Sequence, residues 1–191
     1  AVPVAGLIDK GYIASRSALI SETTSLPSYA AGTPPGAEPR TAALSSEVAG
    51  TTHFVAADRF GGVATMTSTV EGPFGSQLVA NGYVLNNELT DFTFAPTKDG
   101  APVANRPQPG KRPLSSMSPT LVYDADGKPI FAVGAAGGKT IIMQVAKTLI
   151  AHLDWGLGVQ EAIAAPNIYF GGEAIIVDRK SSCRERVSSP V

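Results

Sequence analysis

The chain has 191 residues, of which 43% are hydrophobic and 16% charged. This composition predicts a packed globular domain and excludes a disordered tail. The formal net charge of −1 argues against nucleic acid or an anionic membrane as a partner. The single cysteine excludes an intrachain disulfide framework and a cysteine-rich zinc site, and we expect no metal ion or other cofactor.

The first fifty residues predict a helix followed by a long segment without periodicity. Residues 4–20 place Ile13, Ser17 and Ile20 near helical spacing. Residues 21–50 are rich in Pro, Gly, Ser and Ala, which is typical of a linker or an extended surface arm. No basic leader opens the chain, and its uncharged runs are too short to span a bilayer.

From Thr51 onward, apolar and β-branched residues predict a series of hairpins. TTHFVAAD and VATMTSTV flank the turn DRFGG and predict the first hairpin. An extended segment with a turn at Asn81-Gly82 follows, and then a proline-rich excursion over residues 93–113. PTLVYDADGKPIFAVGAA predicts a second hairpin that turns at Asp126-Gly127.

The C-terminal part predicts two helices and a strand. Residues 139–153 form the best helix, with an apolar face of Ile141, Ile142, Val145, Leu149 and Leu153. VQEAIAAP predicts a short helix that stops at Pro166, and AIIVD predicts a strand. Hairpins followed by helices favour layered α+β packing over a parallel sheet. Residues 179–191 (RKSSCRERVSSPV) have no periodicity and suggest an extension from cloning or a shifted reading frame, or a disordered end.

Thr51 is the first candidate for chemistry. It begins a predicted strand directly after Gly50. Because Thr is common in strands, the plain alternative is an ordinary strand start with no catalytic role. If the chain were cut before Thr51, its new α-amino group, with a pKa of about 8, would serve as the general base for its own hydroxyl. Gly50 suits such a cut because it lacks a Cβ and tolerates a strained peptide.

The segment GAAGGKT, residues 134–140, resembles a phosphate-binding loop but fails its spacing. The loop needs glycine at position 133, where this chain has Val133. Two glycines before a helix can instead direct backbone N–H groups at an oxyanion. A tight turn between a strand and a helix remains the plain alternative.

Two polar segments are candidates for binding a charged ligand. KRPLSSMSPT, residues 111–120, offers hydroxyls that can hold a carboxylate, although such residues often only cap loops. In YVLNNELTDF, residues 83–92, Asn87, Glu88 and Asp91 can bind an ammonium group or form a turn. The two histidines, His53 and His152, form no metal pair, and we assign His53 no catalytic role.

Together, in order and spacing, five segments resemble the small subunit of γ-glutamyltransferases, also called γ-glutamyltranspeptidases or glutathione hydrolases. They are TTHF (51–54), TSTVEGPFGS (67–76), LNNELTDF (85–92), KRPLSSMSPT (111–120) and GAAGGKT (134–140). The resemblance covers residues 51–178, an incomplete small-subunit core. Residues 1–50 resemble the end of the large subunit with the linker to the processing site, and residues 179–191 match nothing in the family.

The resemblance implies an α+β fold, the αββα sandwich of N-terminal nucleophile hydrolases, which we expect to be truncated here. It implies autocleavage between Gly50 and Thr51, and a γ-glutamyl ester on Thr51 that water or an acceptor amine resolves. The implied catalytic residues are Thr51, Thr69, Gly137 and Gly138, of which Thr69 bonds the nucleophile and the glycines form the oxyanion hole. The implied substrate residues are Glu88 and Asp91 for the α-ammonium, and Ser115 and Ser116 for the α-carboxylate.

Three departures from the family pattern bear on function. Glu71 stands where well-studied members of the family carry Asn beside the α-ammonium, which makes the pocket more acidic. The extra charge would either tighten binding of the ammonium or shift the substrate toward another acyl group. The family's carboxylate-binding Arg lies in the large subunit, which is almost wholly absent. The small subunit also ends early, which would leave strand edges and apolar surface exposed.

We therefore expect the parent protein to be the enzyme and this chain alone to be inactive, and to associate with itself without the missing large-subunit segment. The resemblance implies a γ-glutamyl substrate of the glutathione class and a periplasmic or secreted location. A glutaryl-type cephalosporin acylase on the same scaffold stays open because of Glu71. A non-catalytic, unprocessed module also stays open, and nucleotide binding is the weakest alternative.

Overall fold

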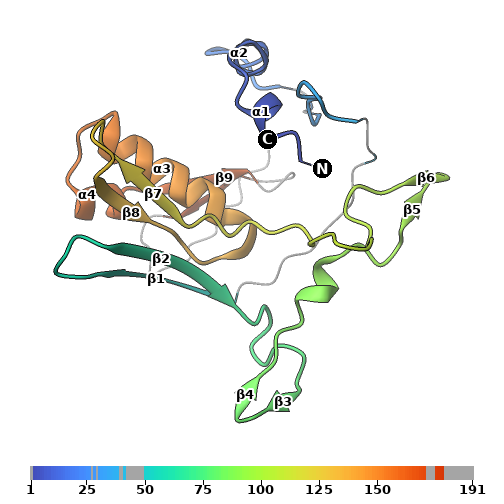
Figure 1. Cartoon of the computed structure of the whole chain (residues 1–191). Helices are drawn as coiled ribbons and strands as arrows, with labels where there is room; N and C mark the ends of the chain where they lie inside the picture. Colours follow the sequence, from blue (N-terminus) through green and yellow to red (C-terminus); the bar gives the residue numbers. More distant parts are fainter. Residues whose placement is uncertain are drawn as a thin grey trace. The chain divides into compact units, whose positions relative to one another are not determined.

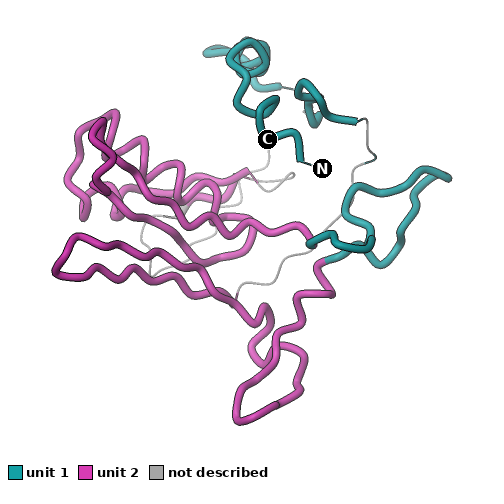
Figure 2. The backbone as a smooth tube through the Cα atoms, in the orientation of Figure 1, with its two compact units in different colours: residues 1–45, 92–112 teal, residues 46–91, 113–191 magenta. Residues whose placement is uncertain are grey.

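The computed structural model describes residues 2–26, 28, 30–38, 41, 50–170 and 175–178. The residues 179–191, for which we predicted an atypical tail, lie outside this described part. The chain divides into two compact units, residues 1–45 with 92–112 and residues 46–91 with 113–191 (Figure 2). The proline-rich excursion thus belongs with the N-terminal unit.

The first unit contains two short helices where we predicted one. Helix α1 spans Val4–Leu7 and helix α2 spans Lys10–Ser17. They are separate because Asp9 is extended and caps α2, accepting a 2.7 Å hydrogen bond from the Tyr12 N–H. The unit also holds β5 (Thr97–Lys98) paired with β6 (Ala101–Pro102), and Val103, which is almost fully buried.

The second unit begins with the predicted hairpin at Thr51, which is confirmed. Strand β1 (Thr51–Ala57) pairs antiparallel with β2 (Val63–Thr69), and Thr51 stands opposite Thr69. In β2 every second side chain is half-buried and the others are exposed, as expected for a sheet with one covered face. Asp58 closes the turn by accepting the N–H groups of Phe60 and Gly62.

The two other predicted turns also form hairpins. Strands β3 (Val79–Ala80) and β4 (Tyr83–Val84) flank Asn81-Gly82, whose backbones both have positive φ. Strands β7 (Thr120–Tyr123) and β8 (Pro129–Val133) pair antiparallel, with β2 in contact with β8 (Figure 1). Between these hairpins the chain makes a 3-10 helix, η1, over Glu88–Asp91.

The helices follow as predicted, with one error in the helix face. A 3-10 turn, η2 (Gly138–Thr140), leads into α3 (Ile141–Leu153), and α4 spans Val159–Ala164. The residues of α3 that are buried are Ile141, Val145, Thr148 and Ala151. Ile142 is 52% exposed and Leu153 48%, because each lies about 100–120° around the helix from Ile141.

One strand was missed. Strand β9 (Asn167–Phe170) directly follows Pro166 and pairs antiparallel with β10 (Ile175–Asp178), the strand that we predicted. Helix α3 contacts α4, β8 and β9. The described strands form separate two-stranded sheets, so the second unit is a partial α+β layer structure.

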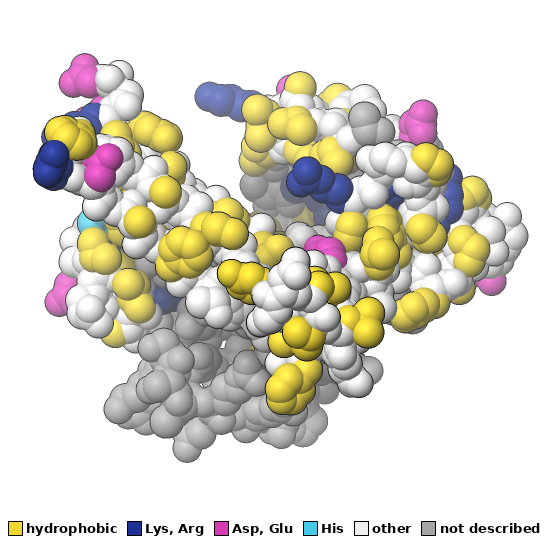
Figure 3. Space-filling view, turned by 60° about the horizontal axis from the view of Figure 1, so that its bottom comes forward, with side chains coloured by type: hydrophobic (Ala, Val, Ile, Leu, Met, Phe, Trp, Pro, Cys, Tyr) yellow, Lys and Arg dark blue, Asp and Glu magenta, His cyan; other side chains and the backbone are white. Residues whose placement is uncertain are grey.

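Large apolar side chains lie on the surface of the chain. Phe60 is 81% exposed at the tip of the β1–β2 hairpin and Leu89 is 79% exposed in η1. Figure 3 shows hydrophobic side chains spread across the visible face. Such surface is typical of a protein face that another segment covers. None of the helices in the described part of the chain has the length and apolar character needed to cross a membrane.

Candidate active site

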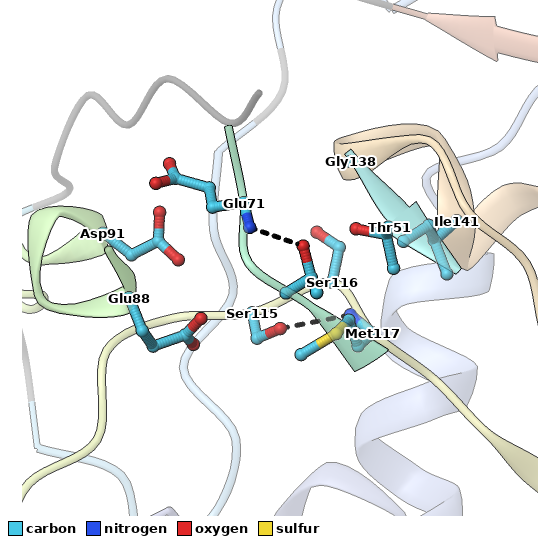
Figure 4. A pocket seen from close by; sticks show the side chains of 10 residues that line it. Thr51, Glu71, Glu88, Asp91, Ser115, Ser116, Met117, Gly138 and Ile141 are labelled. Atoms are coloured by element: carbon cyan, nitrogen blue, oxygen red, sulfur yellow. Dashed lines mark hydrogen bonds between the residues drawn. The ribbon is translucent and has the colours of Figure 1, made fainter. Parts of the chain in front are cut away.

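One pocket of the second unit gathers most of the residues singled out in the sequence. Eight predicted site residues line it, namely Thr51, Thr69, Glu71, Glu88, Asp91, Ser115, Ser116 and Gly138, together with Met117 and Ile141. Figure 4 shows the three carboxylates on one side, Thr51 and Gly138 on the other, and the serines between them. Of the predicted residues, Gly50 and Gly137 are not in the lining but are bonded to residues that are.

The hairpin register places two threonine hydroxyls at this pocket. Thr51 begins β1 and Thr69 ends β2, and the two are direct partners in the antiparallel ladder. Thr69 Oγ1 donates a 3.3 Å hydrogen bond to the carbonyl oxygen of Gly50 and accepts a 2.8 Å bond from the Glu71 N–H. A hydroxyl is therefore aimed at the carbonyl of the peptide bond that joins Gly50 to Thr51.

Gly50 is sterically required at its position. A Cβ placed there would lie 1.9 Å from the backbone carbonyl oxygen of Glu71, far inside contact distance. Because that atom belongs to the backbone, the clash has no easy relief. The close approach of the two backbones explains the glycine in structural terms.

The acidic side of the pocket is built by a strained loop and a 3-10 helix. Glu71 is only 9% exposed and has a φ of +70°, an uncommon conformation for a residue with a side chain. Thr90 Oγ1 lies 3.2 Å from Glu71 Oε2 and 2.7 Å from the Asn87 carbonyl oxygen, and shares its one proton between these two acceptors. Glu88 and Asp91 are the two ends of η1 and present two further carboxylates to the same pocket.

The serine pair lies in an irregular segment before β7. Ser115 Oγ accepts a 3.3 Å hydrogen bond from the Met117 N–H, which fixes the local turn. Ser118 Oγ donates to the Ser116 carbonyl at 2.8 Å. Hydroxyl groups can both donate and accept, so this segment provides hydrogen-bond donors between the carboxylates and Thr51.

The glycine loop turns into η2 and α3 at the edge of the pocket. Gly137 has a φ of +128° and Gly138 of +59°, which side chains disfavour. Thr140 Oγ1 donates to the Gly137 carbonyl at 2.9 Å, and Gln144 Nε2 donates to the Ala136 carbonyl at 3.1 Å. The loop thus brings Gly138 to the pocket at the N-terminal, electropositive end of a helix.

Sequence reasoning missed two polar residues that organise this region. One is Thr90, described above, and the other is His53, which lies two residues beyond Thr51 on β1. Its Nδ1 lies 2.9 Å from Thr67 Oγ1 and its Nε2 3.3 Å from Thr65 Oγ1. Burial lowers the pKa of His53 from its usual value. The alternation of threonines in β2, opposite His53, was the available signal.

The arrangement suits acyl chemistry on a zwitterion. The hydroxyl of Thr51 at a strand terminus lines the same pocket as Gly138 at the start of a helix, with carboxylates and serine hydroxyls at two further places. Within the described residues, no cluster of His, Cys, Asp and Glu is arranged to hold a metal ion.

The chain is similar to known proteins over most of its length. The family model described as gamma-glutamyltranspeptidase matches residues 1–186. The glutathione hydrolase proenzyme of Bacillus subtilis subsp. natto is 40% identical over 177 residues, covering 88% of this chain and 29% of the relative. The acylase ACY 1 proenzyme of Pseudomonas sp. (strain SE83) is 34% identical over 173 residues, covering 90% of this chain and 28% of the relative.

The solved structures agree with the sequence comparisons. A threonine-to-alanine mutant of Helicobacter pylori gamma-glutamyltranspeptidase superposes with a TM-score of 0.57 at 33% identity, covering 66% of this chain and 72% of that one. The predicted fold class, a partial α+β N-terminal nucleophile hydrolase, is therefore confirmed. The chain spans less than a third of the length of the curated relatives described here.

Proposed function

The chain belongs to the γ-glutamyltranspeptidase family, and from this premise we propose that its parent protein hydrolyses γ-glutamyl amides such as glutathione or transfers their acyl group to amines. The observation that carries the proposal is the single pocket that joins Thr51, three carboxylates, two serines and Gly138. This set matches each charged end of a γ-glutamyl group and its reacting carbonyl.

The first step is maturation of the chain itself. Thr51 Oγ attacks the Gly50 carbonyl carbon, the C–N bond breaks, and an ester with a free Thr51 amine results. Water then cleaves the ester and leaves Thr51 as a new N-terminus. The hydrogen bond from Thr69 to the Gly50 carbonyl supports this step, because it polarises the bond under attack.

The mature site would then act on the substrate. The Thr51 α-amine takes the hydroxyl proton while Thr51 Oγ attacks the γ-carbonyl carbon of the substrate. Backbone N–H groups of Gly137 and Gly138 stabilise the oxyanion, and the departing amine receives the proton as the γ-glutamyl ester forms. Water or an acceptor amine attacks the ester and restores the Thr51 hydroxyl.

Charge complementarity supports an amino-acid acyl group as the substrate. Glu71, Glu88 and Asp91 would surround its α-ammonium, and Ser115 and Ser116 would donate to its α-carboxylate. A glutaryl group has no ammonium, so it would bring no positive charge to the acidic side of the pocket. We therefore rank a glutaryl acylase second, although one relative is named an acylase.

We propose that this chain acts together with the remainder of the same precursor. Relatives named proenzymes are more than three times as long, and apolar residues such as Phe60 and Leu89 are largely exposed here. The chain alone is expected to self-associate and to be inactive. The family resemblance further implies export to the periplasm or the cell exterior, which fractionation of the producing cells would test.

The first experiment is intact mass and N-terminal sequencing of the purified full-length protein, followed by labelling with an electrophilic glutamine analogue. A fragment beginning TTHFVAAD that carries one label supports Thr51 as the nucleophile. An uncut, unlabelled chain would favour the non-catalytic module instead. Rates on a γ-glutamyl anilide and a glutaryl amide then separate the two enzyme classes.

A further inference from the structure

His53 lies between two parts of the proposed site. It follows Thr51 by two residues on β1, so alternation along the strand directs both side chains to the same face. Thr67 stands directly opposite His53 in the ladder, and Thr65 lies two residues before Thr67 on β2. Both ring nitrogens are within hydrogen-bond distance of these two hydroxyls. The ring is therefore held in one orientation.

The imidazole packs against the start of the glycine loop. A Cβ placed on Gly134 would lie 2.2 Å from Cε1 and Nδ1 of His53, and 2.6 Å from Nε2. The ring thus fills the space in which a side chain at position 134 would stand. The backbone of Gly134 does not have a positive φ, so its conformation does not require glycine. The contact with His53 is the structural reason for a glycine at this position.

The same loop continues to the residues that face the nucleophile. Four residues after Gly134 it reaches Gly138, which lines the pocket with Thr51. Hydrogen bonds from Gln144 of α3 to Ala136 and from Thr140 of η2 to Gly137 hold its later part. Its beginning is held by the contact between Gly134 and His53.

A pocket of about 260 Å³ that is open to solvent lies beside this contact, lined by His53, Gly134, Gln144, Lys147, Thr148 and Asn167 among others. The loop therefore has room to move if the imidazole is removed. A displacement of its donors by about 1 Å costs on the order of 100-fold in rate in comparable sites.

We propose that His53 is a positioning residue, which sets the spacing between the nucleophile strand and the Gly134–Gly138 loop by occupying the space over Gly134. This inference rests on the proposed function and deepens it. It assigns His53 no contact with substrate. Its effect falls on kcat, since oxyanion stabilisation acts in the transition state, whereas the groups proposed to bind the amino acid are untouched.

The test is a double-mutant cycle of His53→Ala and Gly134→Ala in the full-length protein, assayed for γ-glutamyl anilide hydrolysis. We expect Gly134→Ala to lower kcat about 100-fold and His53→Ala about 10-fold, with KM changed less than about twofold. The double variant should recover about 10-fold over Gly134→Ala, because the added methyl enters the vacated space. Gly158→Ala, whose Cβ meets only the end of the flexible Glu161 side chain, is the matched control.

Additive effects in the double variant, or full kcat in His53→Ala, would overturn the role of His53. If Gly134→Ala fails to fold, Thr67→Val replaces it. This variant removes the 2.9 Å bond to Nδ1 while leaving the ring packed, and should lower kcat about threefold at constant KM. An unchanged kcat in Thr67→Val would also count against the proposal. If the wild-type protein has no activity on the γ-glutamyl anilide, the proposed function itself is wrong. If the wild type is active and the variants have the wild-type kcat, only the inference about His53 is wrong.

Discussion

Thr69 donates a hydrogen bond of 3.3 Å to the carbonyl oxygen of Gly50, across the antiparallel pair in which it stands opposite Thr51. A carbonyl that accepts a bond from a fixed hydroxyl is already polarised towards attack. The relationship links the sheet register to the chemistry proposed at the same peptide bond.

Replacing Thr69 by Val should therefore slow maturation about 10- to 100-fold, since it removes a donor to the oxygen that gains charge during attack. Densitometry of the precursor and product bands over time measures this rate. Ser68→Ala is the matched control, because Ser68 is exposed on the other face of the same strand. A precursor with Val at position 69 that matures at the wild-type rate would show that the bond has no part in cleavage.

A second prediction concerns Gly50→Ala. The new methyl would meet the Glu71 carbonyl oxygen at 1.9 Å, so the backbone around the cleavage site must move and maturation should fall by about 10-fold or more. Gly72→Ala serves as the control, because its Cβ would meet nothing within 4 Å. Intact mass after a fixed incubation reads out both variants. Equal maturation of the two would contradict the steric argument.

A third prediction concerns Glu71→Gln. Loss of one of three carboxylates should raise KM for a γ-glutamyl anilide about 10-fold, corresponding to about 1.4 kcal/mol, and should improve the relative rate on a glutaryl amide. Steady-state kinetics on both substrates measure the change. Asp126→Asn, in the β7–β8 turn, removes a surface carboxylate as the control. A Glu71→Gln protein with unchanged KM would place the ammonium elsewhere.

The fourth prediction concerns pH. Burial lowers the pKa of His53 in the folded protein, so the unfolded chain binds the proton more tightly. The resulting loss of folding stability is absent well above the unfolded pKa of about 6.5 and grows as the pH falls through that value. The folded protein should therefore become less stable on acidification. Melting temperatures between pH 5 and 8 should fall less steeply in His53→Gln than in the wild type. Parallel curves would assign the acid sensitivity to other groups.

The sequence predicted the hairpins well, because their turns carry strong local signals. Asn81-Gly82 marks its turn by backbone conformation, whereas Asp58 and Asp124 close the first and last hairpins through their own side chains. Local patterns were weaker for α3, where neighbours in space decide which stripe is buried. They also missed β9, because a four-residue strand directly after a helix and a proline has little periodicity to detect.

The pocket residues were named from a family resemblance, and the structure brings eight of them to one place. Their roles remain proposals that the variants above address. Contacts across the fold were beyond reach from sequence. The bond from Thr90 to Glu71 spans 19 positions, and the packing of His53 on Gly134 spans still more. No local rule couples such positions.

The alternation along β1 and β2 has one more consequence. Half-buried Thr65, Thr67 and Thr69 form a polar row on one face of β2, and they meet Val55, His53 and Thr51 in the pairing. A slip of one residue in this hairpin would turn the whole row outward and separate Thr51 from Thr69. Misfolding by a single step would thus yield a chain unable to cut itself. The self-cleavage proposed here would then select chains with the correct register, since only these would mature.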